Sequence, residues 1–231
     1  MKALLALLAV LILVPVAGAR TYSTTFPNTE NPLSESNNWV NGGATGLLWH
    51  DCRSTAGFAF GTQPATINYD DSTCVLGGTW GADQTVQATV HIGAADSTQF
   101  EEVELRVHTT ITANSITGYE INCSVKPGNP YIQIVRWNGP LGNFMLIDSR
   151  SVGCANGDVL KATIVGSTIT AYKNGTQILQ VTDSVYGGGA PGMGFYIQNG
   201  SASTNSDFGF SNFTATDGQP PPPTNLTATV H

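Results

Sequence analysis

The chain has 231 residues, with 9 basic and 16 acidic side chains and a formal net charge of −7. This acidic balance excludes a nucleic-acid-binding surface, because the phosphate backbone would be repelled. Charged residues are only 11% of the chain, against roughly 25% in ordinary globular proteins. Gly, Ser, Thr and Asn supply the polarity instead, a composition common among secreted β-proteins.

Residues 1–19 are predicted to be a signal peptide. Lys2 precedes an apolar run at residues 3–14, Pro15 ends it, and Ala17-Gly18-Ala19 provides small residues for cleavage before Arg20. The run is too short for a stable membrane span. A transmembrane anchor or a lipoprotein is the alternative, but no Cys follows the run to accept a lipid. We therefore expect a secreted or cell-surface protein without a membrane span. Cleavage removes Lys2 and leaves 8 basic and 16 acidic side chains, a charge of −8.

The mature chain reads as a series of short strands. No segment repeats apolar residues with helical spacing over three turns, whereas short alternating runs between Gly, Asn, Asp and Pro recur. The predicted strands cover residues 58–60, 85–92, 101–110, 118–125, 131–137, 144–152, 159–165, 168–173, 177–182, 192–198 and 207–215. Asn174-Gly175 predicts a type I′ hairpin turn. Many antiparallel strands without crossover helices restrict the fold to all-β, as a two-layer sandwich or a closed barrel.

Four cysteines, an even number in an exported chain, predict two disulfides. Three pairings are open, and we prefer Cys52–Cys74 with Cys123–Cys154 because neighbouring pairs close shorter loops. A zinc site is the competing interpretation, but the chain has no CxxC or CxxH spacing to support it.

The predicted strand at residues 101–110 carries the most suggestive side chains for catalysis. Alternation places Glu102, Glu104, Arg106 and His108 on the face opposite the apolar residues. Carboxylates, a guanidinium and an imidazole are the groups used in general acid/base chemistry on a sugar. An acid/base ladder also keeps an exposed strand soluble, and we favour this solvated-face interpretation.

The C-terminal half resembles concanavalin A-like lectin/glucanase domains, including laminin-G-like jelly rolls. The resemblance covers residues 119–215 and rests on "G-D-V-L" at residue 157, "I-T-A-Y-K-N-G" at residue 169, "G-M-G-F" at residue 192 and "F-G-F-S-N-F" at residue 208. It implies a jelly-roll sandwich whose final strand returns beside the N-terminal strand, with Phe208, Phe210 and Phe213 in the core. It also implies that a glycan would lie on the concave sheet.

The catalytic motifs of these relatives are not met. Glucanases of the superfamily carry E-x-D-x-x-E on one strand, and the strand at Glu102 lacks the central Asp and the final Glu. Alginate lyases with this fold carry Q-x-H, where this chain has Gln133-Ile134-Val135. A carboxylate pair drawn from separate strands stays open. Calcium is common in the superfamily, and Asp70, Asp71 and Asp96 lie in predicted loops, but no complete calcium-loop motif is present. We therefore predict no cofactor and leave calcium open.

Binding residues are better supplied than catalytic ones. Aromatic rings stack on sugar rings while amides bond the hydroxyls. Tyr131, Gln133 and Trp137 share one face of a predicted strand, and Tyr196 and Gln198 share a face of another. Trp137, beside the turn Asn138-Gly139-Pro140, is the aromatic that we expect to be most exposed.

Residues 218–231 follow the predicted sandwich domain at residues 20–217. Pro220–Pro223 form a semi-rigid spacer, and the stub at residues 221–230 resembles the opening strand of a fibronectin type III module, so further domains are expected. The predicted function is a secreted carbohydrate-binding or adhesive module of a multidomain protein, with a polysaccharide or glycan as partner. A glycoside hydrolase or polysaccharide lyase, and a structural subunit of a cell-surface assembly, are the alternatives.

Overall fold

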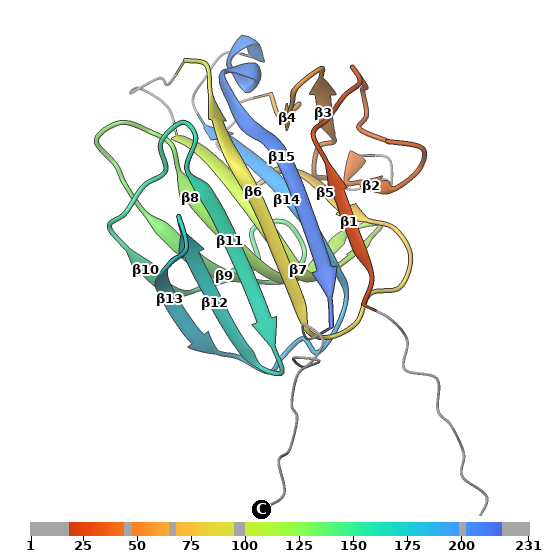
Figure 1. The fold of residues 1–231 in the computed structure, drawn as a ribbon, viewed down its shortest axis with the longest axis vertical. Coiled ribbons are helices and arrows are strands. Elements are labelled where there is room, and N and C mark those ends of the chain that lie inside the picture. Colours follow the sequence, from red (N-terminus) through yellow and green to blue (C-terminus); the bar gives the residue numbers. More distant parts are fainter. Residues whose placement is uncertain (1–18, 44–47, 65–67, 95–99, 199–201, 219–231) are drawn as a thin grey trace, which may run out of the picture.

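The structure is a computed structural model, and it describes residues 19–43, 48–64, 68–94, 100–198 and 202–218. Within these ranges the backbone forms fifteen β-strands and a short 3-10 helix, η2 (Ala202–Asp207). The strands pair antiparallel into two sheets, which lie face to face (Figure 1). The expected all-β, two-layer sandwich is confirmed.

Each sheet mixes strands from distant parts of the chain. The eight-stranded sheet has, in spatial order, β13 (Thr176–Thr182), β12 (Thr168–Lys173), β11 (Val159–Val165), β6 (Gln84–Ile92), β15 (Phe208–Asp217), β4 (Phe58–Gly61) and β3 (Cys52–Thr55), with β1 (Thr21–Thr24) paired to β15. The seven-stranded sheet has β10 (Phe144–Arg150), β9 (Ile132–Gly139), β8 (Ser115–Ser124), β7 (Phe100–Thr112), β14 (Ala190–Gln198), β5 (Ser72–Leu76) and β2 (Trp39–Asn41). The pairing of β1 with β15 confirms that the last strand returns beside the first.

The core lies between the two sheets and follows from strand alternation. On β7, Val103, Leu105 and Val107 are fully buried and point toward the other layer. Phe195 of β14 and Phe210 of β15 meet across the layers with ring centroids 5.6 Å apart. Phe208, Phe210 and Phe213 are all buried, as expected for the inner face of a sandwich.

Both preferred disulfides are present. Cys52 and Cys74 are bonded with their Cα atoms 5.8 Å apart, and Cys123 and Cys154 with theirs 5.9 Å apart. Cys52 belongs to β3 and Cys74 to β5, so the first disulfide joins the two sheets. The second ties β8 to the segment that follows β10.

All eleven predicted strands are present, with ends shifted by a few residues. Asn174 and Gly175 both have positive φ, 50° and 78°, as the predicted type I′ turn requires. The four strands that the sequence did not predict are β1, β2, β3 and β5, all within the first 76 residues. Each has at most five residues, too few for alternation to stand out from the surrounding loops.

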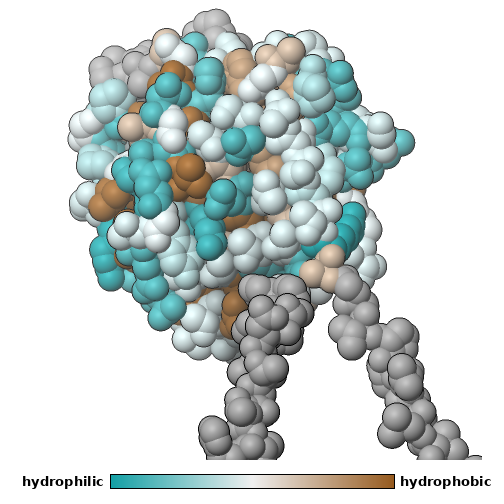
Figure 2. Space-filling view, in the orientation of Figure 1, coloured by the Kyte–Doolittle hydropathy of each residue, from teal (hydrophilic) through white to brown (hydrophobic). Residues whose placement is uncertain are grey.

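The ends of the described domain lie side by side. The backbone N–H of Arg20 donates to Asp217 Oδ1 at 2.5 Å, so the chain enters and leaves the domain at the same end of the sandwich (Figure 1). The outer face of the eight-stranded sheet mixes hydrophilic and hydrophobic residues without a continuous apolar patch (Figure 2). Among the described residues, no helix has the length and apolarity to cross a membrane. The predicted signal peptide and the proline spacer with its fibronectin-like stub lie outside the described residues, apart from Ala19 and Gly218.

Candidate functional site

The register of the seven-stranded sheet gathers polar side chains on its outer face. Arg106 of β7 is paired with Glu120 of β8, and Glu104 with Asn122. Because directly paired residues of antiparallel strands project from the same face, these four side chains are neighbours. Glu102 joins them one pair further along β7, opposite Tyr196 of β14.

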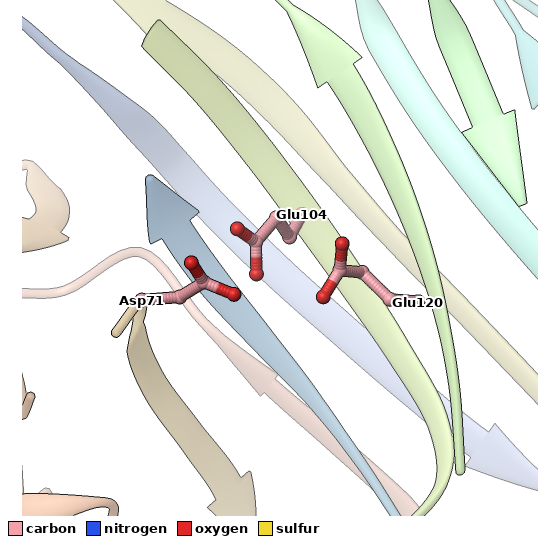
Figure 3. A group of neighbouring side chains, drawn as sticks. All are labelled: Asp71, Glu104 and Glu120. Carbon is pink, nitrogen blue, oxygen red and sulfur yellow. The ribbon is translucent and has the colours of Figure 1, made fainter. Parts of the chain in front are cut away.

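Arg106 forms ion pairs with three acids of this group. Its Nη2 lies 2.5 Å from Glu104 Oε2, 3.0 Å from Glu120 Oε2 and 3.2 Å from Asp71 Oδ2. Asp71 comes from the segment immediately before β5, and its carboxylate points toward those of Glu104 and Glu120 (Figure 3). Together with Glu102, these acids form a unit that we name the carboxylate cluster: Asp71, Glu102, Glu104 and Glu120.

The carboxylate cluster is buried, so the solvated-face interpretation of this strand is wrong. Glu104 is 0% exposed and Arg106 1%, and Glu102 is also buried. Alternation identified the correct face, but tertiary contacts cover that face. A buried charge is costly unless it is paired, and the ion pairs with Arg106 provide part of that compensation.

Two acids of the carboxylate cluster, Glu102 and Glu120, accept hydrogen bonds from uncharged donors. Tyr131 donates its hydroxyl to Glu102 Oε1, and Asn122 Nδ2 donates to Glu102 Oε2 at 3.1 Å. Trp137 Nε1 donates to Glu120 Oε2 at 2.7 Å. These bonds fix the orientation of both carboxyl groups without adding positive charge.

Burial shifts the protonation of the carboxylate cluster. Desolvation, reinforced by the charge of Glu120, raises the pKa of Asp71 to about 7 although Arg106 opposes the shift. Desolvation raises the pKa of Glu102 to about 8 against the opposing hydrogen bond from Tyr131. The pKa of Glu104 also rises well above its usual value because of desolvation and the charges of Asp71 and Glu120. The pocket therefore retains protons at neutral pH.

Gly194 of β14 leaves the space that Glu104 and Arg106 occupy. A Cβ on Gly194 would lie 2.1 Å from Glu104 Oε2 and 3.0 Å from Arg106 Nε. We expect Gly194→Ala to displace this ion pair and lower the free energy of unfolding by about 1–3 kcal/mol, measured by urea denaturation. Gly187→Ala is the matched control, because a Cβ at Gly187 meets nothing within 4 Å. Equal stability of the two variants would contradict the expectation.

A pocket of about 80 Å³ opens above the carboxylate cluster, with aromatic rings around it. Tyr69 is 48% exposed. Its ring centroid lies 4.9 Å from that of Phe144 on β10 and 6.4 Å from that of Tyr196 on β14. Tyr69 thus contacts rings from both sides of the carboxylate cluster. The pocket is lined by Tyr69, Asp71, Glu102, Glu104, Glu120, Asn122, Val135, Trp137, Phe144 and Tyr196.

His108 does not join the carboxylate cluster, contrary to the alternation pattern. A bulge interrupts the register after Val107, and His108 has a positive φ of 51°. Its Nδ1 lies 2.8 Å from the carbonyl oxygen of Tyr186, and its Nε2 faces the carbonyl oxygen of Ala82. The flanking positions are Gly118 and Gly189, where a Cβ would lie about 2.5 Å or less from the His108 backbone. These glycines make room for the bulge that turns His108 away.

The predicted binding residues divide into two groups. Trp137 and Tyr196 line the pocket, and Tyr131 bonds Glu102 behind it. Gln133 and Gln198 are half-buried residues of β9 and β14 that lie outside the described pocket lining. The expectation of an exposed Trp137 is wrong: its side chain is 3% exposed and packs against Trp49 and Phe144. Tyr69 is the exposed ring instead.

Sequence reasoning missed Glu120, Asn122 and Tyr69 as site residues. Gly118, Glu120, Asn122 and Ser124 alternate with apolar residues along the predicted strand, a signal as clear as that of the neighbouring strand. Asp71 was considered only as a loop residue for calcium. The sequence offers no signal for Tyr69, because the segment before β5 reaches the pocket only in the folded chain.

The oxygen atoms of Asp71, Glu104 and Glu120 lie within 4.8 Å of one another, close enough to share a cation. Arg106 Nη2, however, already bonds one oxygen of each. A calcium ion held by those same oxygens at about 2.3–2.6 Å would meet the positive guanidinium, so Arg106 competes with calcium for these three carboxylates. Asp70 instead accepts from Gln63 Nε2 at 2.7 Å and lies 3.3 Å from His50 Nε2. Asp96 lies outside the described residues.

Comparison with known proteins gives no match to any family model and none among curated sequences. Solved structures do match. The carbohydrate-binding module CBM66 from Bacillus subtilis superposes with a TM-score of 0.54 at 16% identity, covering 72% of this chain and 96% of that one. The Emp47p carbohydrate recognition domain gives 0.51 at 14% identity, with 86% and 96% covered.

The exoplasmic/lumenal domain of VIP36, in a form bound to Ca²⁺ and Man2, gives a TM-score of 0.53 at 8% identity, with 86% of this chain and 90% of that one covered. The chain shares the two-layer, jelly-roll β-sandwich fold of these domains. At these identities the likeness concerns the fold alone, and the activity has to be argued from the pocket.

Proposed function

We propose that this domain is a carbohydrate-binding module and that the sugar binds in the pocket above the carboxylate cluster. The observation that carries the proposal is the pairing of aromatic rings at the rim with hydrogen-bonding groups on the floor. Tyr69, Phe144 and Tyr196 contribute aromatic rings to the lining, while Glu104 and Asn122 contribute oxygen atoms that can accept hydrogen bonds. Sugars have apolar ring faces and hydroxyl edges, so they need both kinds of group.

The proposed setting is an exported, multidomain protein. Two disulfides within one domain support export, because disulfides persist mainly in oxidising compartments. The likeness to CBM66 supports a carbohydrate-binding module, whose attachment through the proline spacer would raise the effective concentration of its neighbours at a polysaccharide. Uronic acids and sulfated sugars are disfavoured, because their negative charges would raise the free energy of ionised carboxylates in the cluster.

The test of this proposal is retention on insoluble polysaccharides, followed by affinity measurement for the best binder. We expect Tyr69→Ala to weaken binding about tenfold, since one ring stacked on a sugar contributes roughly 1 kcal/mol. The side chain is 48% exposed, so its truncation should leave the fold intact. The assay is run with Ca²⁺ and with a chelator, and we expect equal binding in both.

Tyr172→Ala is the matched control. Tyr172 lies on β12 of the other sheet, with Lys161 Nζ 4.9 Å from its ring centroid. Its loss should leave binding unchanged. Equal weakening by both variants would locate binding elsewhere, and no retention on any polysaccharide would favour the structural role.

A second candidate function is glycoside hydrolysis, favoured by the buried carboxyl groups. A general acid must hold its proton at working pH, and the pKa of about 8 at Glu102 meets that requirement. The assay above therefore also measures new reducing ends and unsaturated products. Product formation that disappears in Glu102→Gln would replace the binding proposal with catalysis.

A further inference from the structure

The pocket has an excess of acid over base. Four carboxyl groups line it or lie on its floor, and Arg106 is the only guanidinium among the described residues that bonds them. No Lys, Arg or His side chain belongs to the described pocket lining. If all four acids were ionised, one arginine would leave a charge of −3 in a low-dielectric site. A cation entering the pocket would favour ionisation of these acids, and its attraction to the ionised groups would be stronger than in water.

Two atoms of the pocket lining have no hydrogen-bond partner among the described residues. They are Glu104 Oε1 and Asn122 Oδ1, and both side chains are more than nine-tenths buried. Buried polar atoms are nearly always satisfied, so unpaired ones in a pocket point to a ligand. Asn122 Oδ1 is an acceptor, and Glu104 Oε1 is an acceptor whenever its carboxyl group is ionised. A partner that donates hydrogen bonds and carries positive charge satisfies both atoms, because its charge favours the ionised carboxylate.

The aromatic residues of the pocket lining also favour a cationic ligand. Tyr69, Tyr196, Phe144 and Trp137 line the pocket. The faces of aromatic rings carry negative electrostatic potential and attract cations within about 6 Å of the centroid. These rings could stack on any sugar, but they would attract a sugar with a positive charge more strongly.

We propose that the pocket recognises a primary ammonium group on its carbohydrate, so that the ligand is an amino sugar whose nitrogen is not acetylated. The inference rests on the proposed function and names its ligand class. An ammonium group supplies three donors, enough for Glu104 Oε1 and Asn122 Oδ1, and it also compensates the charge excess. A hydroxyl group supplies one donor and no charge, and an acetamide supplies one donor with added bulk.

Proton release should accompany binding. Because the empty pocket keeps protons on buried carboxyl groups at neutral pH, an incoming ammonium group would lower their pKa values and expel protons. Calorimetry in two buffers of different ionisation enthalpy measures the number released. A neutral sugar should release fewer.

The decisive comparison uses three β-1,4-linked tetramers that differ only at C2: glucosamine with an amine, N-acetylglucosamine with an acetamide, and glucose with a hydroxyl. We measure their affinities by calorimetry in physiological salt. The glucosamine tetramer should bind about 10- to 100-fold more tightly than either other tetramer, as expected for charge-assisted hydrogen bonds.

Equal or weaker binding of the glucosamine tetramer would overturn this inference, as would binding only to sugars without an amine. Either result would leave the proposed carbohydrate function standing. If no polysaccharide in the retention assay and no tetramer binds, both proposals fail together.

Glu104→Gln tests the position of the ammonium group. Its amide can still accept from Arg106 but would present a donor where Oε1 now accepts, so the preference for the glucosamine tetramer should disappear. Asp148→Asn, on the edge strand β10 and outside the described pocket lining, is the control because it removes one negative charge from the protein elsewhere. Loss of preference in both variants would indicate long-range attraction to an acidic protein and would overturn the inference. If Glu104→Gln does not fold, the three-tetramer comparison on the unmodified chain decides alone.

Discussion

Replacing Arg106 with methionine should lower the free energy of unfolding at pH 7 by about 3–5 kcal/mol, the cost of breaking a buried ion pair by removing one partner. Methionine keeps much of the volume, so the loss reports charge rather than a cavity. Glu104, Glu120 and Asp71 would each lose a bond of 3.2 Å or less to Nη2 and remain buried. Urea denaturation of both proteins measures the difference.

Arg150→Met is the matched control for this prediction. Arg150 pairs with Asp148 at 2.7 Å, but its side chain is about half exposed on the edge strand β10. Exposed pairs contribute about 1 kcal/mol or less. A loss at Arg106 no larger than that at Arg150 would show that the carboxylate cluster is compensated by water or protons rather than by the guanidinium.

Stability should also fall as pH rises from about 4 to about 8, by several kcal/mol. The pKa values of Asp71 and Glu102 are raised to about 7 and about 8 from ordinary values of 3.8 and 4.5. The folded state therefore binds protons more tightly than the unfolded state. This contribution is complete below the unfolded pKa values and is lost as pH rises through the folded ones. Urea denaturation at a series of pH values measures it.

Other charged groups of the protein determine the pH range over which stability falls. Glu104 has a raised pKa and adds to the loss, while Arg106 stays charged throughout because its pKa is raised further. Asp158 and Asp183 have lowered pKa values, so their contribution is lost only as pH falls below about 4. Maximum stability should thus lie in mild acid.

Glu102→Gln tests how much Glu102 contributes to the dependence of stability on pH. The amide does not titrate, so the decline between pH 4 and 8 should be shallower in the variant. Stability that instead rises steadily with pH up to 8 would contradict the raised pKa values. The same result would also contradict the proposed proton release on ligand binding, because the buried carboxyl groups would then hold no protons to release at neutral pH.

The sequence by itself determined the fold class, eleven of the fifteen strands in the described residues and the presence of two disulfides, whose observed pairing was the preferred one of three. These depend on local physical chemistry: alternation with period two, positive φ at Asn174-Gly175, and an even number of cysteines. Alternation also put Glu102, Glu104 and Arg106 on one face, and the structure agrees. The same signal was present for Glu120 and Asn122 on the neighbouring strand but was not used for the site.

Only the tertiary structure decided what covers that face. Alternation states which way a side chain projects but not whether water reaches it, so the acids were expected to be solvated and are buried. Asp71 and Tyr69 come from the segment before β5, and their place depends on pairings between distant strands. His108 was misplaced because a bulge beside Gly118 and Gly189 breaks the period of two. Strand pattern is a local property, whereas burial, pKa and the pocket depend on contacts made across the sheet, which no single stretch of sequence contains.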